Sequence, residues 1–227
     1  MFGLDDRVAG FSNGTTILVV LGVSVLLGLR HASDPDHLTA VTTMIASRRD
    51  HATRRAARLG LTWGLGHATS LFVFGLPVVL YGAYLPERIQ AAAETAVGLV
   101  IVVLAVALLV RWRRGVYRFP AHAHPRGRTR WQAYAIGLVH GMGGTAGVGL
   151  LLLATIQSRV LALAALALFA ACTAVSMTVL SAGFGVAMSA DAVRRSFHRV
   201  APALGIASFA FGVWYALGAQ GVVPYIL

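Results

Sequence analysis

Residues 91–118 read AAAETAVGLVIVVLAVALLVRWRRGVYR, an apolar run that ends abruptly at a group of arginines. A helix needs about 20 apolar residues to cross the hydrocarbon core of a bilayer. Residues 91–110 meet that length, and similar runs recur on both sides along the 227-residue chain. The sequence therefore predicts an all-α, polytopic membrane protein.

The composition supports this fold class. Apolar residues make up 57% of the chain and charged residues only 12%, too few to cover a soluble globular surface. We expect a single transmembrane domain over residues 1–227. The apolar runs predict about six transmembrane helices, at residues 15–46, 59–81, 91–110, 132–156, 160–187 and 201–223.

The first of these runs has an unusual length. Residues 15–46 are too many for one upright helix and too few for two helices with a turn between them. Proline bends a helix because it lacks an amide hydrogen and clashes with the preceding turn. We expect one tilted helix that is kinked at Pro35.

The net charge of +11 comes from arginines that cluster in the loops at 48–58, 111–130 and 194–199. Arginine-rich loops mark the cytoplasmic side of a membrane protein. The pattern predicts a multi-pass protein of the cell membrane with these loops in the cytoplasm and both termini outside. Because topology accounts for the basic residues, we expect no nucleic-acid partner.

Six helices divide into two sets of three, with half one at about 14–112 and half two at about 131–227. An odd number of spans in each half makes any internal repeat inverted in the membrane. Residues 28–31, GLRH, match residues 137–140, GLVH, at the equivalent place in each half. The sequence allows a 3+3 inverted repeat.

Residues 30–37 read RHASDPDH and place ionisable side chains inside an apolar span. Such groups are costly at membrane depth and normally face a cavity, a partner or an ion. On a regular helix His31, Asp34 and His37 lie on one side because they are three residues apart. Asp36 is expected to point away from them.

Two further histidines, His67 and His140, also lie within predicted spans. Counted from the cytoplasmic arginines at about 1.5 Å per residue, they share the depth of His37, with His31 a turn or two further out. Pro35 is expected to leave the carbonyl oxygen of His31 free. The glycines that allow the helices to approach are Gly60, Gly64, Gly143 and Gly147.

Imidazole and carboxylate ligands suit Ni²⁺, Co²⁺ and Zn²⁺, whereas a copper(I) path would be rich in sulfur and Mg²⁺ or Ca²⁺ would prefer oxygen. The chain has one cysteine and five methionines. A lone membrane histidine often serves only as a hydrogen-bonding group, and Asp34 could simply pair with Arg30. The whole cluster favours a metal site.

These motifs resemble the nickel/cobalt transporter family, in particular its short members similar to UreH-type urease accessory permeases. The similarity lies in the segment from Arg30 to His37, in WGLGHATS at 63–70 and in HGMGGT at 140–145. The second acidic motif of the longer members is not found here, and Pro35 stands where they usually have alanine. The resemblance implies metal recognition by six residues, namely His31, Asp34, Asp36, His37, His67 and His140.

We therefore predict a secondary permease for Ni²⁺ or Co²⁺, with Zn²⁺ also compatible, in which the metal is the transported substrate and no cofactor is needed. Cytoplasmic metallochaperones or urease assembly proteins are the partners that this function would involve. Two alternatives remain open. One is an intramembrane zinc-dependent hydrolase, and the other is a membrane subunit that delivers metal without transporting it.

Overall fold

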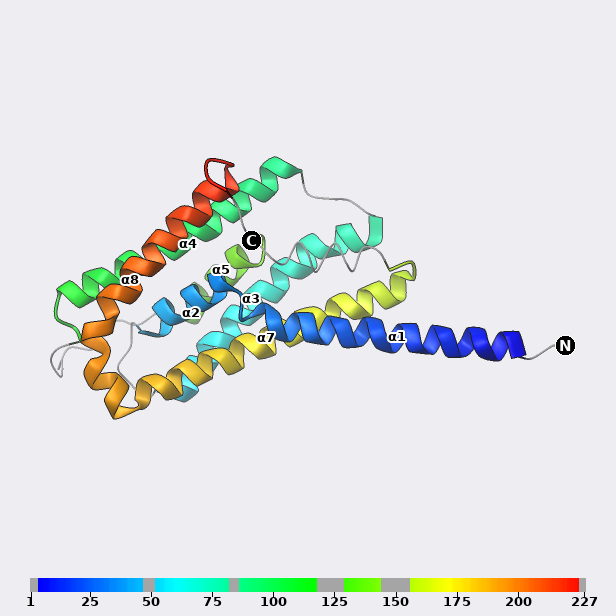
Figure 1. Ribbon diagram of the computed structural model, residues 1–227, viewed down its shortest axis with the longest axis horizontal. Coiled ribbons are helices and arrows are strands. Elements are labelled where there is room, and N and C mark those ends of the chain that lie inside the picture. The colour runs from blue at the N-terminus through cyan, green and yellow to red at the C-terminus, as the bar shows by residue number, and fades with distance from the viewer. Residues whose placement is uncertain (1–3, 47–51, 82–85, 118–128, 144–155, 225–227) are drawn as a thin grey trace.

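The computed structural model describes residues 4–46, 52–81, 86–117, 129–143 and 156–224 (Figure 1). Every regular element in these ranges is an α-helix, which confirms the predicted fold class. The helices are α1 (Leu4–His31), α2 (Pro35–Ala46), α3 (Ala52–Tyr81), α4 (Glu87–Arg113), α5 (Arg130–His140), α7 (Arg159–Ser189) and α8 (Asp191–Ala219).

Four helices, α3, α4, α7 and α8, are each long and apolar enough to cross a membrane. The pair α1 and α2 meets the same criterion when the two helices are taken together as one bent span. The remaining predicted span, 132–156, begins in α5, but residues 144–155 lie outside the described residues. The protein is a multi-pass membrane protein, and the number six stays a prediction.

The first predicted span is two helices rather than one kinked helix. Helix α1 ends at His31, α2 begins at Pro35, and the two helices are bent by 46° at the break between them. Proline is well suited to the first position of a helix because its missing N–H would have no partner there. The carbonyl oxygen of His31 is not free as expected, because it accepts a hydrogen bond of 3.2 Å from the amide of Asp34.

The helices pack in two groups with α2 between them (Figure 1). Helix α3 packs mainly on α7 and α5, and α1 lies along α7, whereas α4 packs on α8. Helix α2 contacts α4, α7 and α8. This short helix therefore lies inside the bundle, where it carries the residues of the second half of the RHASDPDH segment.

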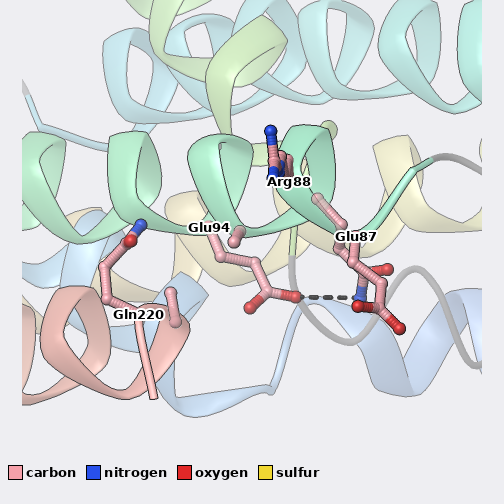
Figure 2. A pocket seen from close by; sticks show the side chains of 7 residues that line it. Glu87, Arg88, Glu94 and Gln220 are labelled. Atoms are coloured by element: carbon pink, nitrogen blue, oxygen red, sulfur yellow. Dashed lines mark hydrogen bonds between the residues drawn. The ribbon is translucent and has the colours of Figure 1, made fainter. Parts of the chain in front are cut away.

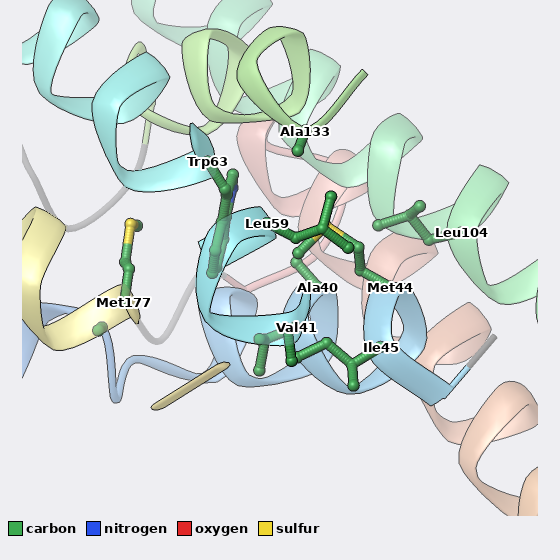
Figure 3. Close-up of a cluster of buried hydrophobic side chains, with 11 residues drawn as sticks. Ala40, Val41, Met44, Ile45, Leu59, Trp63, Leu104, Ala133 and Met177 are labelled. Atoms are coloured by element: carbon green, nitrogen blue, oxygen red, sulfur yellow. The ribbon is translucent and has the colours of Figure 1, made fainter. Parts of the chain in front are cut away.

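The apolar face of α2 fixes its position (Figure 3). Val41 and Met44 of α2 are almost fully buried in a cluster with Leu59 and Trp63 of α3 and Leu104 of α4. Because lipid tails are as apolar as these side chains, close packing rather than exclusion from water stabilises such contacts in a membrane. The cluster holds α2 in one rotational setting about its axis.

Small residues allow α3 and α5 to approach closely. A methyl group on Gly66 would overlap the carbonyl oxygen of Tyr134, and one on Gly137 would overlap that of Trp63. The glycines that the sequence singled out lie at other contacts. Gly60 and Gly64 pack against α7, Gly143 packs against α4, and Gly147 lies outside the described residues.

Candidate metal centre

Four histidines from four helices form one buried cluster. His31 ends α1, His37 lies in the first turn of α2, His67 lies in the middle of α3 and His140 ends α5. The centroid of the His37 ring is 4.6 Å from that of His31, 5.1 Å from that of His67 and 5.6 Å from that of His140. Each residue is at most 4% exposed.

Local sequence explains how the two terminal histidines are presented. Helix α1 stops at His31 because the amide of Ser33 turns back to the carbonyl of Arg30 at 2.8 Å, so the chain leaves the helical path. Helix α5 starts at a capping box, in which Thr129 and Gln132 each accept a hydrogen bond from the other's amide. It ends at His140, directly before Gly141.

Three of the histidines have ring nitrogens close enough to share one ion. One nitrogen each from His31, His37 and His67 lies within 4.8 Å of the other two. The Nε2 atoms of His31 and His67 are 3.0 Å apart. Two nitrogens bound about 2.1 Å from a metal at a right angle would be about 3.0 Å apart, so this pair already has the spacing of neighbouring ligands.

The two aspartates each contact the Nδ1 atom of one imidazole ring. The Nδ1 atom of His31 is 3.2 Å from a carboxylate oxygen of Asp34, and the Nδ1 atom of His37 is 3.0 Å from Oδ1 of Asp36. A carboxylate that accepts a hydrogen bond from one ring nitrogen fixes the tautomer and directs the other nitrogen toward a metal. Asp34 also lies 4.0 Å from the exposed Arg30 guanidinium, so the predicted ion pair coexists with this contact.

His140 is oriented in a similar way by the backbone. Its Nδ1 atom lies 3.2 Å from the carbonyl oxygen of Ile136, to which it can donate a hydrogen bond. Its other ring nitrogen, Nε2, has no hydrogen-bond partner among the described residues. His140 lies outside the tight group of three nitrogens, although its ring contacts that of His37.

Several buried polar atoms of the cluster have no hydrogen-bond partner among the described residues. They are Oδ2 of Asp36, Nε2 of His37, Nδ1 of His67 and Nε2 of His140. An unpaired polar atom that is removed from water costs free energy, and a group of them in one place calls for an explanation such as a bound ion. The donor set fits a divalent ion that accepts imidazole nitrogen.

Two aromatic side chains flank the cluster, and the sequence analysis missed their role. The ring of Trp63 lies 5.6 Å from that of His37 and 5.8 Å from that of His140, and the ring of Phe169 lies 5.7 Å from that of His31. Trp63 stands one helical turn before His67 on the same face. This spacing is the signal that would have placed it beside the site.

The structure corrects two sequence-based expectations about the cluster. His31 does not lie a turn or two away from the other histidines, because the break before Pro35 brings its ring back against His37. Asp36 does not point away, since it is 2% exposed and adjoins His37. Both expectations assumed a continuous helix through residues 31–37.

A separate cavity of about 420 Å³ lies at the end of α4 nearest Glu87 (Figure 2). Three of its polar lining residues make side-chain hydrogen bonds. Gln90 donates a hydrogen bond of 3.2 Å to Glu94, and Gln220 donates one of 2.7 Å to Thr95. None of the four clustered histidines lines this cavity, so it is not part of the candidate metal centre.

Comparison with known proteins gives the chain a family. Residues 17–129 match the NicO family, which is described as high-affinity nickel-transport protein. The urease accessory protein UreH of Bacillus sp. (strain TB-90) is 25% identical over 209 residues, which cover 88% of this chain and 91% of that protein. No solved structure matches the chain.

Two further relatives match a shorter part of the chain. The high-affinity nickel transport protein of Cupriavidus necator is 37% identical over 95 residues, and the cobalt transport protein NhlF of Rhodococcus rhodochrous is 34% identical over 89 residues. These matches cover 40% and 38% of this chain but only 26% and 24% of those longer proteins. Together these findings assign residues 17–129 of this chain to the NicO family, described as high-affinity nickel-transport protein.

Proposed function

We propose that this protein carries Ni²⁺ or Co²⁺ across the membrane as a secondary transporter and that the histidine cluster is its ion-binding site. The observation that carries the proposal is the meeting of His31, His37 and His67. They come from three separate helices, each is buried, and one nitrogen of each lies within 4.8 Å of the others. An ion bound there would link elements that must move relative to one another during transport.

The six predicted residues take different roles in this proposal. Imidazole nitrogens of His31, His37 and His67 bind the ion directly, and His140 is close enough to join them as the ion enters or leaves. Asp34 and Asp36 act through His31 and His37, whose rings they orient. The two carboxylates also supply the negative charge that a dication needs in a membrane.

The chemistry of the ligands supports nickel and cobalt as substrates. Imidazole suits both ions, whereas a soft copper(I) ion would require thiolate or thioether ligands. The relatives are named for nickel transport, cobalt transport and urease accessory function. None is named as a hydrolase, so the hydrolase alternative has no support from them.

The membrane potential provides a driving force for uptake. An inside-negative potential contributes about 2.3 kcal/mol per elementary charge per 100 mV, hence roughly twice that for a dication. The proposed topology places the arginine-rich loops in the cytoplasm and both termini outside, in line with the positive-inside rule. Metal then enters from the side of the short loops without the use of ATP.

A second candidate role is delivery of metal to cytoplasmic proteins that assemble urease. The relative that matches most of the chain is named a urease accessory protein, which favours this role. The arginine-rich segment 111–130 would be the docking surface for a metallochaperone. The two roles are compatible, because a transporter can hand its ion to a partner at the cytoplasmic end.

Ion flux into proteoliposomes tests the proposal. We expect purified protein to accumulate radiolabelled Ni²⁺ when a potassium diffusion potential makes the interior negative, and His37→Ala or His67→Ala to abolish the accumulation. His198→Ala is the matched control, because His198 lies on α8, a helix that carries none of the four clustered histidines. Folded protein that binds Ni²⁺ but shows no flux would favour the delivery role alone.

A further inference from the structure

The first helix of each half, α1 or α5, packs against a long helix of the other half, α7 or α3. Each contact is made through the glycine that begins the GLRH or GLVH motif. On α1, a methyl group at Gly28 would lie 2.6 Å from the carbonyl oxygen of Phe169 on α7. On α5, a methyl group at Gly137 would overlap the carbonyl oxygen of Trp63 on α3. These contacts pair Gly28 with Gly137 and Phe169 with Trp63.

The same pairing of positions, continued without a gap within each helix, also pairs two hydrogen bonds. Ser176 of α7 donates its hydroxyl to the carbonyl oxygen of Leu29 on α1 at 2.6 Å. Ser70 of α3 donates its hydroxyl to the carbonyl oxygen of Leu138 on α5, also at 2.6 Å. Both serines therefore make an interhelical bond to the residue that follows the paired glycine.

A third match lies at the metal centre itself. The ring of His31 at the end of α1 is 5.7 Å from that of Phe169, and the ring of His140 at the end of α5 is 5.8 Å from that of Trp63. Each histidine stands three residues after its paired glycine. The two halves thus present one histidine each in the same local setting.

The remaining helix pair makes reciprocal contacts. A methyl group on Gly98 of α4 would lie 2.8 Å from the carbonyl oxygen of Gly212 on α8, and one on Gly212 would lie 3.0 Å from that of Gly98. Reciprocal contact of this kind is the mark of a twofold axis. Gly205, which precedes Gly212 on α8, contacts Leu109, which follows Gly98 on α4. Helices α4 and α8 therefore run in opposite directions, and the axis is perpendicular to both.

We propose that the two halves are an inverted repeat and that Ser70 and Ser176 are equivalent positioning residues that hold two alternating gates, one on each side of the metal centre. This inference rests on the proposed transport function. The contact of α1 with α7 forms one gate and the contact of α5 with α3 forms the other. Because α1 and α7 run in the direction opposite to α3 (Figure 1), the two gates face opposite sides of the membrane.

The structure has both gates closed. Both serine hydrogen bonds are formed with equal length, and the four histidines between them are at most 4% exposed. In an alternating-access cycle one contact separates while the other is kept. Removing one serine hydroxyl should therefore favour opening on one side, and removing the other should favour opening on the opposite side.

The ligand set does not follow the repeat. The alignment pairs His67 with Thr173, whose hydroxyl donates to Phe169 within its own helix at 2.8 Å. Half one thus supplies His31, His37 and His67, whereas half two contributes His140. The gates are equivalent although the ion is held mainly by one half.

The single cysteine of the chain reports on one gate. Cys172 on α7 faces Gly28, since a methyl group on that glycine would lie 2.7 Å from the Cys172 Cβ atom. Cys172 is partly exposed in this structure. A membrane-impermeant maleimide added from the side of this gate, which the proposed topology makes the outside, should label the thiol faster when α1 separates from α7. Labelling is measured in membrane vesicles of each orientation.

We expect Ser176→Ala to raise the labelling rate of Cys172 about threefold, since one interhelical hydrogen bond of ordinary strength in a membrane is lost. Ser70→Ala should not raise the rate, because both bonds are formed in this structure and loss of the Ser70 bond destabilises the closed and the open state of the α1–α7 gate equally. The double variant should be labelled about as fast as Ser176→Ala. Ser24→Ala is the control, since its hydroxyl bonds only to Val20 of its own helix.

An unchanged labelling rate in Ser176→Ala, or a raised rate in Ser70→Ala, would overturn the inference. Ni²⁺ binding is measured on the same preparations by titration, and we expect all variants to retain it. Faster labelling in Ser176→Ala but not in Ser70→Ala, with normal binding, supports the two gates. Failure of the unmodified protein to bind Ni²⁺ would instead count against the proposed function, so the two failures are distinguishable.

Discussion

The Nε2 atoms of His31 and His67 lie 3.0 Å apart at the end of one helix and the middle of another. Two neutral imidazoles can share one hydrogen at this distance, but a metal can be bound by both. The hydrogen bond therefore holds the pair in place before the ion arrives. An ion that enters replaces this hydrogen bond and needs little rearrangement of the helices.

The histidines should differ in their contribution to affinity. We expect His67→Ala and His37→Ala to weaken Ni²⁺ binding by more than about 100-fold, the upper range for the loss of a group that only supports a ligand. His140→Ala should weaken it less, because His140 lies outside the tight group of three nitrogens. Isothermal titration of purified protein measures this order, and an equal loss in all three variants would contradict it.

Asp36 should act by orienting His37 rather than by packing. Asp36→Asn keeps the size of the side chain and removes its charge, and we expect it to lower Ni²⁺ affinity about 10- to 100-fold. Thermal stability in detergent should change little, because the side chain keeps a hydrogen-bonding group beside His37. A large drop in stability with unchanged affinity would assign Asp36 a structural role.

The coordination of the bound ion should be all nitrogen and oxygen. We expect X-ray absorption spectra of the Co²⁺-loaded protein to show imidazole scattering and no sulfur shell, because the clustered ligand atoms belong to histidines. The imidazole contribution should fall in His67→Ala. A sulfur shell would show that Cys172 or a methionine binds the ion.

The close contact of α3 and α5 should make Gly137 intolerant of a side chain. Gly137→Ala forces a methyl group into the Trp63 carbonyl, and overpacking of this kind costs about 1–3 kcal/mol. Gly183→Ala is the matched control in α7, because nothing lies within 4 Å of its added methyl group. Thermal unfolding in detergent should show a lower midpoint for the first variant and an unchanged or higher one for the second.

The sequence alone predicted the long helices α3, α4, α7 and α8 and named the residues of the candidate centre, because long apolar runs and the rarity of ionisable groups within them are strong signals. It could not predict how those residues meet. The positions of His31 and Asp36 depend on the break before Pro35, and helical spacing says nothing about side chains on either side of a break. Only the path of the chain shows that both belong beside His37.

The helix contacts were also only partly predictable. Glycines were expected to bring the helices together, but Gly60 and Gly64 face α7, whereas Gly66 and Gly137 bring α3 to α5. Any glycine in a span can serve this purpose, and its partner depends on the rotation of two helices. Trp63 was missed for a related reason, since an aromatic residue in an apolar span gives no chemical signal of its own.

Helices α1 and α5 both stop at a histidine of the cluster, one at His31 and the other at His140. The carboxyl end of a helix carries a partial negative charge of about half an elementary charge from its aligned peptide dipoles. Two such ends directed at the same small volume attract a cation without any additional carboxylate. The interrupted first helix thus makes the histidine cluster more favourable for a dication while adding no permanent charge.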